Sequence, residues 1–262
     1  MQVKTALTIG GSDPCGAAGI QADLKVFAAY RVYGMSVITA ITSQNSCAVS
    51  HVMALPGQVV ESQLRAIYND IPVGSLKIGM LSSRENITLL SEFINEVKAK
   101  NVVLDPIIRS SSGAMLIDDN AIDSLVEKLF PRVHLVTPNI EEASFLARME
   151  ITGPDDMKEA ARIIARLGPQ NVLVKGGHLK GKAIDILYDG AGYEIFQGER
   201  IRGGEFRGTG CALSSAIAAG LTGGSHMIRA VKEGKDFVRE SMKRGFHHLG
   251  KGMGILNHNH PL

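Results

Sequence analysis

The sequence lacks the features that mark secreted, disulfide-rich or membrane-spanning proteins. Its three cysteines, Cys15, Cys47 and Cys211, are an odd number with no CxxC spacing, so we expect neither a disulfide framework nor a structural zinc site. No apolar run approaches the roughly 20 residues of a membrane span. The segment Met1–Ile9 lacks the basic region and long apolar core of a signal peptide. We therefore expect a cytoplasmic protein that does not bind membranes.

The chain also lacks a strong charge of either sign. Its 28 basic and 26 acidic residues give a formal net charge of +2, which argues against nucleic acid as the main partner. A length of 262 residues, with no evident linker or repeat, is enough for one large α/β domain. We expect this single domain to cover residues 1–262.

Two common nucleotide-binding motifs are missing as well. The chain has no GxxxxGK(S/T) segment, so it is not a P-loop kinase. The glycine-rich stretch Gly10–Gly19 does not have GxGxxG spacing, and no acidic residue at the end of the second predicted strand suits a ribose. A nicotinamide-binding Rossmann domain is therefore not expected, and we expect this stretch to close over a small, uncharged substrate.

Short β-branched runs alternate with longer helical patterns along the chain. The predicted strands are Thr5–Ile9, Val37–Thr39, Leu76–Ile78, Val102–Leu104, Leu135–Val136 and Val172–Val174. The predicted helices are Ile20–Tyr30, Gln58–Asn69, Glu85–Lys100, Asn120–Phe130, Glu141–Arg148 and Asp155–Leu167. This alternation indicates an α/β fold with a mostly parallel central sheet and helices on both faces.

Two segments depart from the alternation. Ala183–Tyr188 and Tyr193–Phe196, joined by Asp189–Gly192, predict a late antiparallel β-hairpin at the edge of the sheet. The polar tail Asn257–Leu262 could bind a metal adventitiously, but it is more typical of a frayed terminus.

Polar residues and glycines follow the predicted strands. Ligands of open α/β sheets gather beyond the carboxyl ends of the strands, so such segments favour an active site on that rim. The segments are Gly10–Asp13, Thr42–Asn45, Gly79–Met80, Asp105–Pro106, Thr137–Asn139 and Lys175–His178.

The segment Arg207–Cys211 runs directly into a helix of small residues, Ala212–Gly220. Gly208 and Gly210 let backbone N–H groups turn toward one point, and the helix adds its positive N-terminal end there. This combination predicts a site for a negatively charged oxygen. Cys211 at its edge should have a lowered thiol pKa, and the arrangement suits phosphoryl transfer. The alternative is a glycine-rich helix start with a buried small cysteine.

Three charged residues lie on the same predicted rim. Asp105 stands before Pro106, which fixes the turn and aims the carboxylate away from the sheet. Glu142 either complements the dipole of the helix it begins or helps to hold Mg²⁺, which takes oxygen ligands and keeps several waters. Lys175, at a strand end before two glycines, is placed to meet a nucleotide phosphate.

With these motifs in order, the chain resembles the hydroxymethylpyrimidine and phosphomethylpyrimidine kinases of thiamine biosynthesis, within the ribokinase-like superfamily. The resemblance covers essentially the whole chain. It rests on Gly10–Pro14, Ala18–Lys25, Thr42–Asn45, Ile78–Leu81, Asp105–Pro106, Thr137–Ala143, Val174–His178, Gly208–Ala216 and Gly252–His258. Departures from the family pattern occur at Cys15, Ala17, Ile107–Gly113 and Arg207.

The resemblance implies a three-layer ribokinase-like fold and an ATP- and Mg²⁺-dependent kinase. Its substrates would be 4-amino-5-hydroxymethyl-2-methylpyrimidine and then the monophosphate of that pyrimidine. Gln44 would hydrogen-bond the aminopyrimidine edge, and the ring would lie among Gly11, Asp23 and Met80. The anion hole would comprise Gly208, Thr209, Gly210 and Cys211, with Cys211 as the base. ATP would meet Asn139, Lys175, Thr209 and Lys235, and Mg²⁺ would meet Asp105 and Glu142. We also expect a homodimer.

Two other functions stay open at this point. A pyridoxal kinase of the same superfamily also phosphorylates a hydroxymethyl group on a nitrogen heteroaromatic ring. Some such enzymes use a second lid cysteine, which Arg109–Ser112 lacks. A non-catalytic pyrimidine-binding regulator is the third possibility, but a mere binder needs none of Asp105, Lys175 and Cys211.

Overall fold

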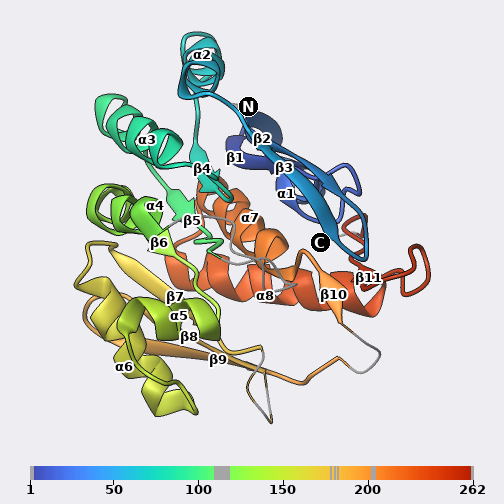
Figure 1. Ribbon diagram of the computed structural model, residues 1–262. Coiled ribbons are helices and arrows are strands. Elements are labelled where there is room, and N and C mark those ends of the chain that lie inside the picture. The colour runs from blue at the N-terminus through green and yellow to red at the C-terminus, as the bar shows by residue number, and fades with distance from the viewer. Residues whose placement is uncertain are drawn as a thin grey trace.

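The computed structural model describes residues 3–108, 119–177, 179, 181, 183–201 and 205–260. Its centre is a nine-stranded sheet (Figure 1). In sheet order the strands are β3 (Val49–Ala54), β2 (Tyr33–Gln44), β1 (Thr5–Ser12), β4 (Ser75–Ile78), β5 (Val102–Leu104), β6 (Leu135–Val136), β7 (Asn171–Lys175), β8 (Ala183–Tyr188) and β9 (Tyr193–Gly198). The strands from β2 to β7 pair in parallel, while β3, β8 and β9 pair antiparallel. The predicted parallel sheet and its late hairpin are confirmed.

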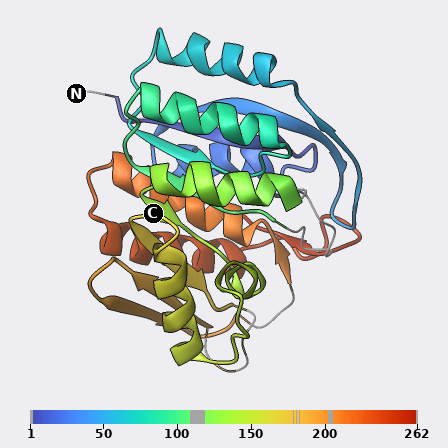
Figure 2. The ribbon, with the colours of Figure 1, turned by 60° about the vertical axis from the view of Figure 1, so that its left-hand side comes forward.

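Helices cover both faces of this sheet, as the two views show (Figures 1 and 2). One face carries α2 (Gly57–Tyr68), α3 (Arg84–Glu96), α4 (Asp119–Ser124), α5 (Ile140–Ala147) and α6 (Pro154–Ala165). The other carries α1 (Gly19–Ala29), α7 (Thr209–Thr222) and α8 (Met227–Lys243). Two short strands, β10 (Phe206–Arg207) and β11 (Gly254–Ile255), pair in parallel beside α7. The three-layer α/β architecture expected from the sequence is therefore confirmed.

The strands supply both halves of the core because successive side chains point to opposite faces. In β5, Val102 and Leu104 pack under the helices of one face, whereas Val103 packs under α7 and α8. All three are fully buried. This two-sided burial explains why the central strands read as continuous apolar runs.

Several predicted boundaries differ from those observed. The first two strands extend to Ser12 and Gln44, so part of the predicted rim is strand rather than loop. The expected helix Asn120–Phe130 is α4 followed by a π-helical turn over Leu125–Leu129 and a 3₁₀ turn over Phe130–Arg132. Pro131 has no N–H to continue an α-helical ladder, which is consistent with this change.

The polar C-terminal tail packs against the protein, so the expectation of a frayed end was wrong for the described residues up to 260. Leu256, His258 and His260 are 2%, 3% and 8% exposed. Nε2 of His260 lies 2.9 Å from Ser241 Oγ, and its ring centroid is 4.7 Å from that of Phe237. Apolar and ring contacts with α8 thus outweigh the polarity of the segment. Among the helices formed by the described residues, none is long and apolar enough to cross a membrane.

Candidate active site

The start of α7 is built as the predicted anion hole requires. Gly208 precedes the helix at φ +78°, and a Cβ there would overlap the carbonyl oxygen of Ala17. Only glycine lets this backbone approach the Asp13–Ala18 loop so closely. The first helical hydrogen bond joins Ala212 N to Gly208 O, and no side chain caps the helix. Within the described residues, the N–H groups of Thr209, Gly210 and Cys211 therefore have no acceptor, as suits an anion.

An acid and a cation from two other strand ends meet this helix start. Lys175 Nζ lies 2.6 Å from Asp105 Oδ1, which also accepts a hydrogen bond from Thr137 Oγ1 at 3.0 Å. A Cβ placed on Gly210 would be 3.1 Å from Lys175 Nζ and 3.3 Å from Asp105 Oδ2. Burial alone would lower the pKa of Lys175, but Asp105 and Glu142 outweigh it and hold that pKa above its ordinary value. The ammonium is therefore charged and faces the anion site.

Glu142 and Asn139 form a reciprocal cap at the start of α5. The Asn139 side chain accepts from Glu142 N at 2.9 Å, and Glu142 Oε2 accepts from Asn139 N at 2.9 Å. Burial raises the pKa of Glu142 to about 7; Lys175 opposes this rise and Asp105 adds to it. Glu142 thus acts at the start of α5, as the first of its two interpretations predicts. It also lies close to the charges of Lys175 and Asp105.

Asp105 and Glu142 could hold a Mg²⁺ ion only if most of its ligands came from water or substrate rather than from the protein. The described residues contain no group of three or more His, Cys, Asp or Glu that could hold a metal. Asp105 Oδ2 accepts no hydrogen bond from them and lies beside Gly210 at the helix start. Mg²⁺ commonly binds through one or two carboxylates, waters and substrate phosphates, and the site is compatible with that arrangement.

Cys211 lies at the predicted place but not in the predicted state. Its side chain is only 7% exposed. Burial raises the pKa of the thiol; Lys77 opposes the rise, while Asp23 and Asp105 add to it. The expectation of a lowered pKa was therefore wrong, because it counted the helix start and left out the enclosure of the sulfur by neighbouring elements.

The expected substrate-binding residues gather where β1, β2 and β4 end. A Cβ on Gly11 would lie 2.7 Å from Met80 Cε, so these two residues are in contact. Thr42 Oγ1 donates to Ser12 O at 2.9 Å, which joins the ends of β2 and β1. Gln44, the last residue of β2, is half-buried near this junction.

Asp23 was expected at the substrate ring and Lys235 at ATP. In the structure, each forms an ion pair with another side chain of the protein. Asp23 is fully buried and accepts hydrogen bonds from three side chains, Thr8, Lys77 and Ser215. It lies beneath the rim, and its carboxylate is already bound by these three side chains. Lys235 on α8 pairs with Asp185 Oδ2 at 2.8 Å and donates to Phe196 O at 3.0 Å. Lys235 therefore connects α8 to the β8–β9 hairpin, where Asp185 lies opposite Lys175.

Sequence reasoning missed two residues that shape the site. The Asp13 carboxylate accepts from the N–H groups of Cys15, Ala17 and Ala18 at 2.9, 3.2 and 2.9 Å. It thereby forms the loop that touches Gly208. Lys77 is 1% exposed in the middle of the sheet. The signals were an aspartate in a glycine-rich turn and a lysine within an apolar strand.

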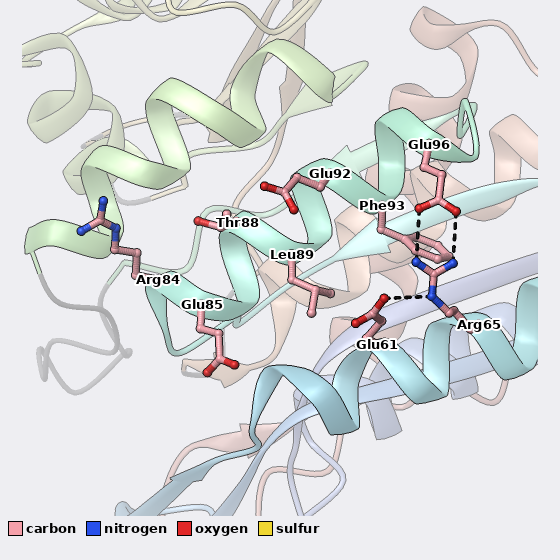
Figure 3. A pocket seen from close by; sticks show the side chains of 9 residues that line it. All are labelled: Glu61, Arg65, Arg84, Glu85, Thr88, Leu89, Glu92, Phe93 and Glu96. Atoms are coloured by element: carbon pink, nitrogen blue, oxygen red, sulfur yellow. Dashed lines mark hydrogen bonds and ion pairs between the residues drawn. The ribbon is translucent and has the colours of Figure 1, made fainter.

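A groove between α2 and α3 lies apart from this site. It is lined by Glu61, Arg65, Arg84, Glu85, Thr88, Leu89, Glu92, Phe93 and Glu96 (Figure 3). Arg65 already pairs there with Glu61 at 2.8 Å and Glu96 at 3.1 Å. None of the expected site residues borders it, so the groove does not compete with the strand-end rim.

The chain is similar to known proteins over nearly its whole length. A family model described as phosphomethylpyrimidine kinase matches residues 13–257. The chain is 42% identical over 253 residues to the hydroxymethylpyrimidine/phosphomethylpyrimidine kinase of Aquifex aeolicus, covering 96% of this chain and 99% of that protein. It is 44% identical over 255 residues to the thiamine biosynthesis bifunctional protein ThiED of Geobacter sulfurreducens, covering 97% of this chain and 52% of the relative. The chain thus spans about half the length of that relative.

A solved structure is similar throughout. The ADP complex of Bacillus subtilis pyridoxal kinase has a TM-score of 0.90 and 38% sequence identity, with 98% of each chain covered. The fold that carries the site described above is therefore shared with that pyridoxal kinase. On the strength of the match to residues 13–257, the chain belongs to the phosphomethylpyrimidine kinase family.

Proposed function

We propose that the protein transfers the γ-phosphoryl group of ATP to 4-amino-5-hydroxymethyl-2-methylpyrimidine and then to the resulting monophosphate, in thiamine biosynthesis. One observation carries the proposal: Lys175 and Asp105 converge on the uncapped start of α7, beside Cys211. The family match and the name of the Aquifex aeolicus relative support the pyrimidine as substrate.

The protein's own groups divide the work between positioning and charge stabilisation, which dominate phosphoryl transfer. The N–H groups of Thr209, Gly210 and Cys211 would hold the transferred phosphoryl oxygens. Lys175, together with Asn139 and Lys235, would hold ATP, and Lys175 would exchange Asp105 for a phosphate. Mg²⁺ would neutralise phosphate charge when bound, and Asp105 and Glu142 would be the acids that hold it.

Cys211 acts as the base in this proposal. Because burial favours the neutral thiol, Cys211 must first lose its proton to solvent. The hydroxyl O–H bond of the substrate then breaks, and its proton passes to the Cys211 thiolate. The freed oxygen bonds to the γ-phosphorus while the bond from phosphorus to the ADP oxygen breaks. Gln44 would hold the aminopyrimidine edge, with Gly11 and Met80 against the ring. Asp23 would act from beneath the site rather than on the ring.

A pyridoxal kinase activity is the second candidate, and the similarity to the Bacillus subtilis enzyme favours it. The lid segment that would carry a second cysteine, Arg109–Ser112, lies outside the described residues. The test is ADP formation by the purified protein with the pyrimidine, with pyridoxal, and with neither. We expect turnover with the pyrimidine at least tenfold above that with pyridoxal. ADP formation with pyridoxal alone would overturn the pyrimidine assignment, and none with either would favour a non-catalytic binder.

We also propose that the chain forms one domain and works as a homodimer in the cytoplasm. One sheet joins strands that lie between Thr5 and Gly198 in the chain, which supports one domain. Ile41 and Met53 are cross-strand partners at the β3 edge and are 45% and 49% exposed; a second copy would cover them. All three cysteines are free, as suits a reducing compartment. Sedimentation of the wild type and of Met53→Lys tests the dimer: only the variant should be monomeric, and a monomeric wild type would refute it.

A further inference from the structure

A buried ion pair lies beneath the Cys211 helix, and the mechanism above gives its lysine no role. Lys77 of β4 and Asp23 of α1 have side chains that are 1% and 0% exposed. Lys77 Nζ lies 2.8 Å from Asp23 Oδ2. Such a pair contributes little net stability, because desolvation of two charges offsets their attraction. Its presence below a reactive centre therefore calls for another explanation.

The pair is held rigidly by four elements. Asp23 Oδ2 also accepts from Thr8 Oγ1 of β1 at 2.5 Å, and Oδ1 accepts from Ser215 Oγ of α7 at 2.7 Å. Lys77 Nζ is also close to Gly79, where a Cβ would lie 3.0 Å away. The ammonium thus has a fixed position just below the end of β4.

Helix geometry puts Ser215, which binds the carboxylate partner of this cation, one turn along α7 from Cys211. On α7, Ser215 follows Cys211 by four residues, so both lie on the same face. On α1, Asp23 follows Gly19 by the same spacing. The backbone of Gly19 favours the thiolate of Cys211, and one turn along each helix Asp23 accepts a hydrogen bond from Ser215. The two helices pack against each other, and Val26 of α1 shares a buried cluster with Ala212 and Ala216 of α7.

The charges around the sulfur favour a role for Lys77. Burial alone would lower the pKa of Lys77, but Asp23, Cys211 and Asp105 outweigh it and keep the ammonium charged. Of the charged groups that face Cys211, Lys77 favours the thiolate more strongly than Asp23 or Asp105 disfavours it. Lys175 also faces Cys211, but its charge is directed to Asp105 at 2.6 Å.

We propose that Lys77, held in place by Asp23, is a positioning residue for phosphoryl transfer, whose fixed buried charge stabilises the thiolate of Cys211. The inference rests on the proposed function, in which that thiolate takes the substrate proton. Lys77 itself transfers no proton and contacts neither substrate nor nucleotide.

The test follows ionisation of the thiol without any substrate. In a Cys15→Ser/Cys47→Ser background, Cys211 is the sole thiol, and its titration is read from thiolate ultraviolet absorbance against a matched Cys211→Ala reference. Lys77→Met should move the midpoint upward by about one pH unit or more. If that variant does not fold, Asp23→Asn/Lys77→Met removes both charges while keeping an amide for Thr8 and Ser215. The double variant should still move the midpoint upward, because the effect of Lys77 exceeds that of Asp23.

Ser215→Ala is the matched control, since it loosens the same cluster without changing a charge. Its midpoint should stay at the wild-type value. The charge variants should also lose about tenfold or more in kcat near neutral pH, with an unchanged KM for ATP. A wild-type midpoint in the charge variants, or an equal rise in Ser215→Ala, would overturn the proposal and leave the kinase assignment intact. A shifted midpoint in a protein that fails to phosphorylate the pyrimidine would support the electrostatic role and count against the proposed function alone.

Discussion

Lys175 and Asp105 form an ion pair of 2.6 Å between the ends of β7 and β5, across the intervening strand β6. Without nucleotide, the Lys175 ammonium and the Asp105 carboxylate neutralise each other, and both side chains are largely buried. A phosphate that binds the start of α7 would compete with Asp105 for Lys175, and the released carboxylate could then serve a cation. The pair therefore links nucleotide binding to the availability of the acid.

Asp105→Asn tests this link. The substitution keeps shape but removes the charge, so the Mg²⁺ concentration for half-maximal activity should rise about tenfold and kcat should fall. The measurement is turnover over a Mg²⁺ titration. Asp155→Asn is the control, because Asp155 also pairs with a lysine but its side chain is 96% exposed. Equal curves for wild type and Asp105→Asn would make Asp105 structural.

Gln44→Leu tests the substrate end of the site. Loss of a hydrogen-bonding pair to the aminopyrimidine should raise the KM for the pyrimidine about tenfold or more, at an unchanged KM for ATP. Steady-state kinetics with each substrate varied provides the measurement, and Gln58→Leu on the exposed surface of α2 is the control. An unchanged KM for the pyrimidine would show that Gln44 does not hydrogen-bond the ring.

Gly208→Ala should cost both stability and activity. A side chain at φ +78° costs roughly 1–2 kcal/mol by itself, and here the Cβ would also displace the Ala17 carbonyl. Gly224→Ala separates the two effects, since Gly224 has φ +94° but no atom within 4 Å of its Cβ position. Denaturant unfolding should show a larger loss for Gly208→Ala, accompanied by a fall in kcat that Gly224→Ala lacks. Equal losses would mean that the contact with Ala17 is unimportant.

The docked tail predicts a pH-dependent stability. Burial, together with the charges of Lys25 and His260, lowers the pKa of His258 to about 4. The unfolded chain takes up a proton near pH 6.5, whereas the folded chain does not until about pH 4. Stability should therefore fall as pH drops from 6.5 to 4, by on the order of 2–3 kcal/mol.

His258→Leu should flatten the free energy of unfolding over that pH window, while His51→Leu on the exposed edge strand should not. Unfolding curves at several pH values between 4 and 7 measure the effect. An unchanged slope in His258→Leu would show that the acid sensitivity arises elsewhere.

Much of the site was predictable because it depends on local patterns. Asp105, Lys175 and the Gly208–Cys211 segment each stand at a boundary that periodicity and glycine placement reveal. Parallel topology then brings such boundaries to one rim. The Asp23–Lys77 pair was not predictable in this way, because its members come from different elements and their burial depends on packing. The raised pKa of Cys211 and the docking of His260 against Phe237 have the same origin in long-range contacts.

The most direct test of the account is kcat for Cys211→Ala and Cys211→Asp with the pyrimidine as substrate. Alanine fits the small-residue start of α7, so fold and ATP affinity should survive. A positioned base typically contributes about 10²–10⁴-fold, and Cys211→Ala should lose roughly that much kcat. Cys211→Asp should recover part of the loss, because a carboxylate can accept the proton at the same place. Wild-type turnover in Cys211→Ala would contradict the account and leave the anion hole to act without a side-chain base.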